Sequence, residues 1–456
     1  MIQEEDIRQT AKSIVRDKMY YRSKIKPVSV VSILLQLFAY ILVPYSLNFF
    51  NLNSVSTYSI IVATAAPISV AITYYSDSSI LAHPKSADLL SSLVNITLNA
   101  ILFLFLVLLF RELTVSTNLY LNTLATPLVL LTILISYQIS VNKVLGSHLI
   151  ILHHHRLARL GGCTMPILVS VLQLILCLGL KISFLTSLVL GSILSLFLIN
   201  AIIFIFLIRN RNFSVASINP FLTGERYSYG DKQFSPVTLA CFHLRFLKTN
   251  FSGALGLLLA SISTASITWL IYFFCGNEMT AQFFVAQKLF SPIGTINSVW
   301  LIPKTLTTLL SNSDRGYECR KIRIYSLVLI VMTLLCALTL VFIKFFPFAS
   351  PFTTLENMPL TIILVLFTLT ATQQVSILCT LPQITASRTG VILKWQFILI
   401  VATLMSATIA HLAFSHLTGY SSMQILFVVS AAASVYAIWG CNSYAHHSSS
   451  TYECHR

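Results

Sequence analysis

The feature that most constrains this chain is a series of apolar runs of about 20 residues that recur along its whole length. Such a run is what an α-helix needs to cross a hydrocarbon core about 30 Å thick. The runs are continuous rather than alternating, which excludes a transmembrane β-barrel. Because 56% of the 456 residues are hydrophobic and 9% are charged, the sequence predicts an all-α integral membrane protein.

The hydropathy pattern predicts about twelve transmembrane helices. We place them at residues 28–50, 56–76, 89–110, 122–142, 163–181, 185–208, 251–275, 279–302, 324–346, 359–381, 391–412 and 421–442. With the N-terminus inside, only Arg111, Lys181 and Lys344 fall on the outer side. Lys288 lies within a span, and every other Lys and Arg of the 29 in the chain falls inside. This asymmetry predicts that both termini are cytoplasmic.

The longest stretch without a span lies near the middle of the chain and is predicted to be a cytoplasmic linker. It separates a first six-helix lobe from a second one, and a cytoplasmic segment precedes and follows the two lobes. In chain order, the five parts are residues 1–27, 28–208, 209–250, 251–442 and 443–456.

A weak internal repeat relates the two halves. Tyr58 precedes Pro67 in the second span by the same interval that separates Phe283 from Pro292 in the eighth span. Proline removes a hydrogen bond inside a helix, and transporters place interrupted helices at matching positions of their two halves, beside a central site. We therefore predict helix breaks at Pro67 and Pro292, and two lobes around a central cavity.

Lys288 is the basic residue that lies deepest in an apolar span. It follows the start of the eighth span by roughly 14 Å of helix, which is near the middle of the membrane. A lysine at that depth costs at least about 2.5 kcal/mol on insertion. We expect Lys288 to face a polar cavity and bind an anionic group. The alternatives are that its side chain reaches the membrane surface or pairs with Glu278.

The other polar residues within the spans are neutral. No Asp or Glu lies in the middle of a predicted span, whereas cation exporters use a buried carboxylate. Amide and hydroxyl groups suit the hydroxyls of sugars, so we expect several of them to line a substrate path with Lys288. The candidates are Gln282, Gln287, Asn95, Asn99, Tyr137, Gln373 and Gln374. Hydrogen bonding between helices is the alternative role for each of them.

Three basic residues, Lys143, Arg156 and Arg159, lie near the predicted cytoplasmic ends of spans four and five. They either attract a diphosphate head group at a cytoplasmic entrance or simply follow the positive-inside rule. The histidines at 153–155 have no partner spaced to complete a metal site. No phosphate-binding glycine loop, nucleophile elbow or pair of catalytic carboxylates occurs. We therefore expect no metal, no cofactor, no enzyme activity and no nucleic-acid partner.

The segment 275–306 resembles the eighth span of lipid-linked polysaccharide (O-antigen type) flippases in the multidrug/oligosaccharidyl-lipid/polysaccharide exporter superfamily. The matching positions are Gly276, Phe284, Ala286, Lys288, Pro292 and Pro303. Residues 153–180 resemble the Arg-rich start of that family's fifth span, and residues 242–264 resemble the start of its seventh span. At the basic position of the eighth span this chain has Lys rather than Arg.

The resemblance implies a flippase that moves an undecaprenyl-diphosphate-linked oligosaccharide across the bacterial inner membrane by alternating access, during biosynthesis of O-antigen or another surface polysaccharide. It implies membrane lipids, a polysaccharide polymerase and a chain-length regulator as further partners. Three alternatives stay open: a multidrug exporter of the same superfamily, a polytopic oligosaccharide polymerase, and a scaffold for glycan assembly.

Overall fold

The computed structural model describes most of the apolar chain, and the fold is described from these residues. They are 31–32, 34–36, 38–40, 42–74, 89–116, 126–152, 154–209, 236–297, 301–302, 305, 315–345, 359–385, 389–414 and 428–441. Within these ranges the chain forms helices and no strand, and nine helices are long and apolar enough to cross a membrane. Two shorter apolar helices are Leu34–Leu47 and Val428–Cys441.

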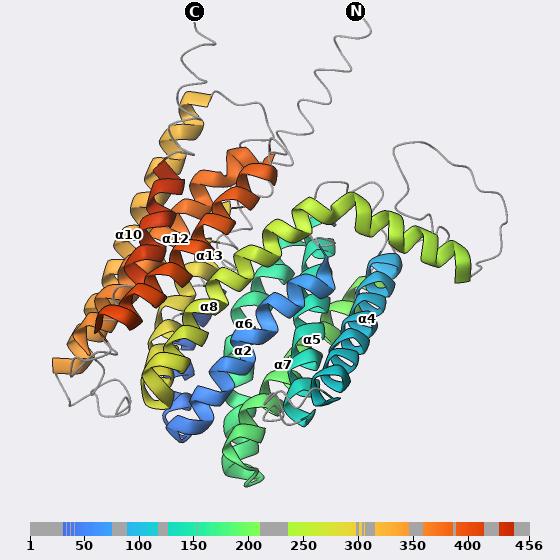
Figure 1. Cartoon of the computed structure of the whole chain (residues 1–456), viewed down its shortest axis with the longest axis horizontal. Coiled ribbons are helices and arrows are strands. Elements are labelled where there is room, and N and C mark those ends of the chain that lie inside the picture. Colours follow the sequence, from blue (N-terminus) through green and yellow to red (C-terminus); the bar gives the residue numbers. More distant parts are fainter. Residues whose placement is uncertain are drawn as a thin grey trace, which may run out of the picture.

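The long helices follow one another in the order of the predicted spans (Figure 1). They are α2 (Leu52–Thr73), α4 (Leu89–Ser116), α5 (Thr126–Ile151), α6 (His155–Leu174) with a π-helical end η3 (Ile175–Gly179), α7 (Phe184–Arg209), α8 (Pro236–Ile296), α10 (Arg315–Phe345), α12 (Leu360–Thr385) and α13 (Thr389–Phe414). Every predicted span overlaps one of these helices or one of the two shorter ones. The prediction of an all-α membrane protein is confirmed.

Helix α8 contains two spans. Its apolar part, Ala254–Ile296, has 43 residues, which corresponds to about 64 Å of helix and so to about twice the thickness of a hydrocarbon core. Gly276 interrupts this stretch with the non-helical angles φ 81° and ψ −177°. Figure 1 shows α8 turning back on itself at one end of the molecule. The predicted separation into spans seven and eight is therefore confirmed.

Two helices extend beyond the predicted boundaries. Helix α5 continues to Ile151 rather than ending near 142. Its last turns contain Asn142 and Lys143, which lower the hydropathy but bond to Asn200 of α7 and Ser69 of α2 inside the lobe. Similarly, α8 begins at Pro236, within the stretch that was predicted to be linker.

Two ring contacts show which helix ends lie together. The rings of Phe50, before α2, and Phe184, at the start of α7, are 6.0 Å apart. The rings of His154, before α6, and Phe206, near the end of α7, are 5.1 Å apart. Helix α7 ends at Arg209, and basic residues gather on the cytoplasmic side. We call the end with Arg209 the inner end and the opposite one the outer end.

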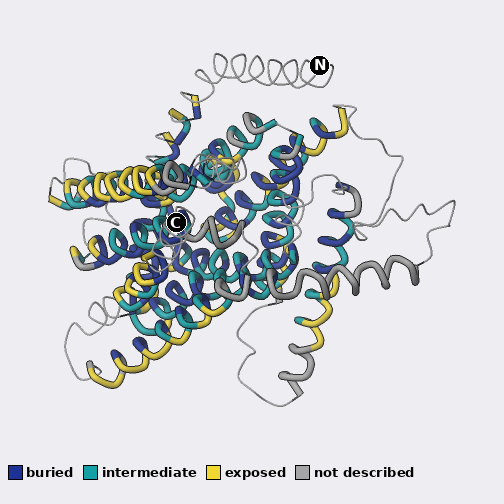
Figure 2. The backbone as a smooth tube through the Cα atoms, turned by 90° about the horizontal axis from the view of Figure 1, so that it is seen from above, coloured by how far each residue is buried: buried dark blue, intermediate teal, exposed yellow. Residues whose placement is uncertain are grey.

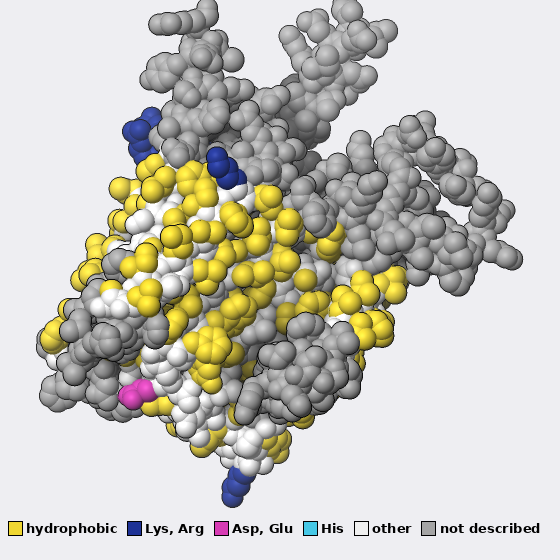
Figure 3. All heavy atoms as spheres, in the orientation of Figure 1, with side chains coloured by type: hydrophobic (Ala, Val, Ile, Leu, Met, Phe, Trp, Pro, Cys, Tyr) yellow, Lys and Arg dark blue, Asp and Glu magenta, His cyan; other side chains and the backbone are white. Residues whose placement is uncertain are grey.

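The helices form two lobes that meet at α2 and α8. Helices α4, α5, α6 and α7 gather on one side, and α10, α12 and α13 on the other, with α2 and α8 between them (Figure 1). In the view of Figure 2, exposed positions lie mainly along the outer sides of the helices. Many of these positions are large and apolar, such as Phe105, Leu327 and Phe397. On the face in Figure 3, hydrophobic side chains cover the area between two charged ends. This surface suits a lipid environment.

The buried apolar residues form two clusters. The shared cluster joins both lobes: it includes Val55 and Leu188 of the first lobe with Phe290 of the second, and it continues to Leu301 near the inner end of the second lobe. The other cluster includes Ile72 and Leu149 and contains residues of the first lobe alone. In the described part of the chain, the outer half of the first lobe therefore packs in one core with the second lobe, and its inner half packs on itself.

Candidate functional site

Lys288 lies on α8 where the two lobes meet. It follows Asn277, at the outer end, by roughly 17 Å of helix, which is close to the middle of the membrane. Its Nζ is 4.7 Å from the centre of the Phe284 ring, one turn earlier. The Phe284 ring packs edge-to-face against Tyr58 of α2, with 5.7 Å between the ring centres. Because residues four apart share a helix face, Lys288 lies on the α2 side of α8, just inward of this aromatic contact.

The half-buried Lys288 does not pair with Glu278. The Glu278 carboxylate is exposed at the outer end of α8 and accepts a hydrogen bond of 3.5 Å from Gln282. Glu278 and Lys288 are about 15 Å apart along the helix. The alternative of an ion pair between them is therefore wrong. Among the described residues, the contact made by the ammonium group is the face of Phe284, a cation–π arrangement.

A buried network behind Tyr58 holds its ring in place. The Tyr58 hydroxyl is 2.6 Å from the hydroxyl of Ser192 on α7. The Gln173 amide on α6 donates to the Leu188 carbonyl at 2.9 Å, and to Tyr58 and Ser192 at 3.3 Å each. These residues hold the Tyr58 ring in place. Phe284 packs against this ring, and Lys288 in turn lies over Phe284. Neither Gln173 nor Ser192 was among the site residues predicted from the sequence. The signal that could have found Gln173 is an isolated amide in a strongly apolar span.

Several of the predicted sugar-binding side chains form hydrogen bonds to neighbouring helices, which is the alternative role considered for them. The Asn99 amide donates to the Ile72 carbonyl of α2 at 2.9 Å, and the hydroxyls of Tyr137 and Thr97 are 3.2 Å apart. The nearby Asn95 is buried in the same lobe. These contacts belong to the inner half of the first lobe, which does not include Lys288.

The glutamines of α12 also serve helix contacts. The Asn297 amide, directly after α8, donates to the Gln374 side-chain oxygen at 2.9 Å and to its carbonyl oxygen at 3.1 Å. Gln373 hydrogen-bonds to the Tyr436 hydroxyl of the last helix. Gln287, half-buried and next to Lys288 in sequence, remains the candidate amide nearest to the cation.

The predicted entrance residues occupy different surroundings. Lys143 donates to the Ser69 hydroxyl at 3.2 Å, between α5 and α2. It therefore lies within the first lobe rather than at the helix end. Arg156 and Arg159 belong to the first turns of α6, and their side chains lie outside the described structure.

The predicted helix breaks at Pro67 and Pro292 are not present, because α2 and α8 continue through them. Pro292 has no N–H for the carbonyl of Lys288, four residues earlier. The Ser291 hydroxyl donates to that carbonyl at 2.7 Å instead. A local side-chain substitute of this kind is how membrane helices tolerate proline.

The lobes are closed at the outer end. The Asn277 amide donates to Asn53 at 3.3 Å and accepts from Ser56 at 3.4 Å. Deeper in the membrane, the Trp269 indole donates to Thr64 at 3.2 Å. The bonds of Asn277 lie at the outer end, whereas Thr64 follows Asn53 by roughly 17 Å of helix and so lies at about the depth of Lys288. Lys288 lies inward of the Asn53–Asn277 contact, which joins α2 and α8 at the outer end of the interface between the lobes.

Solved transporter structures match nearly the whole chain. A MOP-superfamily transporter from Pyrococcus furiosus, described as having a binding pocket of reversed polarity, is 16% identical; the match covers 92% of this chain and 94% of that one, with a TM-score of 0.55. Inward-facing and outward-facing structures of multidrug resistance MATE family transporters are also 16% identical, with TM-scores of 0.51 and 0.52. These two matches cover 90% and 92% of this chain and 95% and 94% of the others.

No protein-family model matches the sequence, and no curated protein matches it. At this level of identity the structural likeness establishes the fold. The chain is a multi-pass membrane protein with the two-lobed fold found in MATE family transporters of the MOP superfamily.

Proposed function

We propose that the protein is an alternating-access transporter whose substrate carries a negative charge, and that Lys288 binds this charge. The observation that carries the proposal is the position of Lys288: near the middle of the membrane, between the lobes and inward of their closed contact. A cation at this depth is costly without a polar or anionic partner. An anionic substrate supplies that partner, and the opening of the outer contact would expose the same residue to the other side.

The structural likeness favours export of the multidrug type over lipid flipping, because structures similar to this chain are described as multidrug resistance transporters. In this reading the substrate is an amphipathic organic anion. Its charged group binds Lys288, and its apolar part lies against Phe284 and Tyr58. The Pyrococcus furiosus transporter is described as having a binding pocket of reversed polarity. A pocket in this superfamily can therefore differ in polarity, which is consistent with a basic residue, Lys288, in the proposed site of this chain.

A second candidate is the flippase for an undecaprenyl-diphosphate-linked oligosaccharide in a bacterial inner membrane. The resemblance of the eighth span supports it, as does the absence of Asp and Glu from the middle of the predicted spans. The diphosphate would bind Lys288 while the polyprenyl tail stayed in the bilayer. A polysaccharide polymerase and a chain-length regulator would act on the product. Because Asn99, Tyr137 and Gln374 bind other helices, Gln287 is the amide we propose for sugar contact.

The test compares wild type, Lys288→Ala and Lys288→Arg in proteoliposomes, with a fluorescent organic anion and the cation ethidium as probes. Loss of a charge-assisted interaction of about 1.5–3 kcal/mol should slow anion transport about tenfold or more. We expect Arg to retain most of the activity. The matched control is Lys394→Ala, which removes an exposed lysine from the same lobe and should behave as wild type. If Lys288→Ala transports the anion normally, or if only ethidium is carried, the proposal is wrong.

The two candidates are separated by complementation of a strain that lacks its O-unit flippase. Restoration of surface glycan by wild type and Lys288→Arg, but not by Lys288→Ala, would identify the flippase. Anion transport without complementation would identify the multidrug-type exporter. A change of polymer length in a polymerase-deficient strain would instead favour the polymerase.

A further inference from the structure

The second lobe contains a cavity that is separate from the site beside Lys288. It has a volume of about 350 Å³ and lies between α10, α12 and the last helix, Val428–Cys441. Packed protein interiors contain few voids larger than a water molecule, and ligand sites start at about this size. A space of this size between three helices is large enough to hold a ligand.

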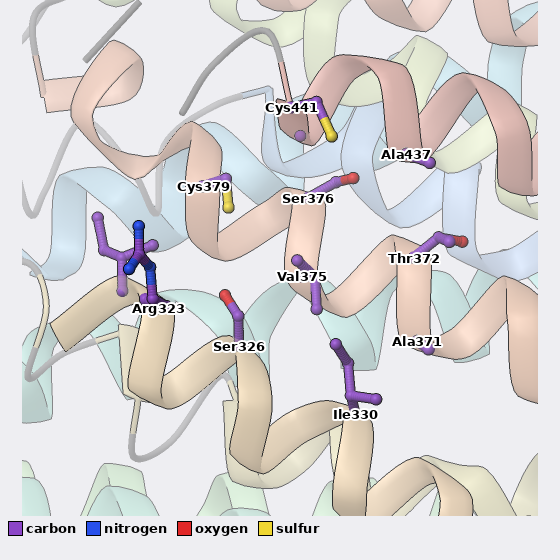
Figure 4. A pocket seen from close by; sticks show the side chains of 12 residues that line it. Arg323, Ser326, Ile330, Ala371, Thr372, Val375, Ser376, Cys379, Ala437 and Cys441 are labelled. Atoms are coloured by element: carbon purple, nitrogen blue, oxygen red, sulfur yellow. The ribbon is translucent and has the colours of Figure 1, made fainter. Parts of the chain in front are cut away.

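The lining of the cavity is almost entirely apolar, with one charged residue, Arg323, at one end. Arg323 and Cys379 lie at one end in Figure 4, and Ala371 and Ala437 lie at the other. Helix α10 begins at Arg315 and α12 ends at Thr385 at the inner end, so the charged end of the cavity is the inner one. From there, α10 leads to Ile330, about 10 Å deeper in the membrane.

The cavity also opens to the surroundings of the protein. Arg323, Ile330, Ala437 and Cys441 line it and are exposed. At this depth the surroundings are membrane lipid, with head groups near Arg323 and acyl chains near Ile330. Arg323 presents a guanidinium group, which recognises phosphate through several N–H donors.

We propose that this cavity binds a phospholipid of the cytoplasmic leaflet with a net negative head group, such as phosphatidylglycerol. The phosphate lies on Arg323, and one acyl chain follows the groove past Ile330 toward Ala371. Basic pockets between transmembrane helices on the cytoplasmic side select anionic head groups in this way. The bound lipid fills the space between α10, α12 and the last helix. The proposal does not depend on what the protein transports.

The experiment is native mass spectrometry of the full chain in detergent, with phosphatidylglycerol and phosphatidylcholine of equal chain length as probes. Wild type should retain one phosphatidylglycerol about fivefold more tightly than phosphatidylcholine. Arg323→Gln should abolish that preference. Arg320→Gln removes a charge from an exposed position one turn earlier that does not line the cavity, so it should keep the preference. Equal retention of both lipids by wild type, or equal loss in both variants, would overturn the proposal.

A second pair of variants tests the acyl-chain path. Ala371→Phe fills the deep end of the cavity and should release the lipid, whereas Val331→Phe, on the exposed side of α10, should not. Ala437→Leu also fills part of the cavity and should also release the lipid. Because Ala437 is exposed, this variant keeps the test valid if Ala371→Phe fails to fold. With Cys441 as the sole cysteine, phosphatidylglycerol should also slow its alkylation by maleimide. Retention of the lipid by Ala437→Leu with unchanged alkylation would place it elsewhere and refute the assignment.

Discussion

Gly191 marks the closest approach of α7 to α6. A Cβ atom at this position would lie 2.6 Å from Cγ of Gln173 and 2.9 Å from its backbone nitrogen. Gln173 cannot move away without breaking its bonds to Leu188 and Tyr58. Gly191→Ala should therefore destabilise the protein by about 1–3 kcal/mol, as overpacking does. Thermal unfolding of purified protein measures this.

The matched control for that variant is Gly161→Ala. A Cβ there would meet Cδ1 of Ile203 at 3.7 Å, which is an ordinary contact. Because alanine favours a helix over glycine by roughly 0.5–1 kcal/mol, this variant should be neutral or slightly stabilising. Equal melting temperatures for the two variants would show that the approach of α6 and α7 is not tight.

The roles of individual polar residues were harder to predict from the sequence than the helices. Lys288 could be identified because a lysine near the middle of an apolar span has few explanations, and the structure places it between the lobes. The amides could not be sorted, because a membrane helix is apolar on its lipid side and on its packed side alike. Asn99 and Gln374 bind other helices in the structure, whereas Gln173, which supports Tyr58, had no pattern around it. A role in substrate binding stays a prediction for these amides, and Gln287 is the one that lies next to Lys288 in the sequence.

At the scale of elements, the turn at Gly276 divides α8 into two membrane spans. Its angles, φ 81° and ψ −177°, belong to a region that is essentially restricted to glycine. Gly276→Ala should destabilise the protein by about 1–3 kcal/mol although no atom lies within 4 Å of the added Cβ. Asn should not rescue the variant, because this is not the left-handed helical region that Asn tolerates.

Gly146→Ala is the control for the turn. It also has no atom within 4 Å of the added Cβ, but it lies inside α5. We expect it to match wild type or to be slightly more stable in the same unfolding experiment. If Gly276→Ala unfolds like Gly146→Ala, the conformation of the turn does not constrain the fold.

The elements themselves were well predicted, since length and hydropathy are enough to find a membrane helix. The ends were less accurate where polar residues turn inward, as Asn142 and Lys143 do in α5. Helices α2 and α8 continue through Pro67 and Pro292, contrary to the predicted breaks, and at Pro292 the Ser291 hydroxyl replaces the lost donor. Hydropathy does not report such local compensation.

At the scale of the whole molecule, the outer contact between the lobes should open and close during transport. Asn53 and Asn277 touch across it, with 3.3 Å between the amide nitrogen and oxygen. In a Cys275→Ser background, a disulfide between Asn53→Cys and Asn277→Cys should hold the outer contact closed and stop the proposed transport. Reduction should restore transport, and each single cysteine variant should remain active. Full activity of the cross-linked protein would show that the lobes do not separate there.

The sequence predicted two lobes but not how they meet. In the proposed transporter, the same residues would serve an inward-facing and an outward-facing arrangement, so no single pattern would encode either one. Similar structures exist in both states, with nearly equal TM-scores. The state is visible only from contacts between distant residues, such as Trp269 with Thr64 and Phe284 with Tyr58.

The hydrogen bonds between α2 and α8, at the outer contact and deeper, join uncharged groups. The hydrogen bonds between Asn53, Ser56, Thr64, Trp269 and Asn277 join amides, hydroxyls and an indole, none of which carries a formal charge. Ionic screening acts on charges, so these hydrogen bonds themselves should hardly change with ionic strength, and Glu278, next to Asn277, is a titratable group beside them. A membrane potential would then act on the cycle through Lys288 or through its bound anion.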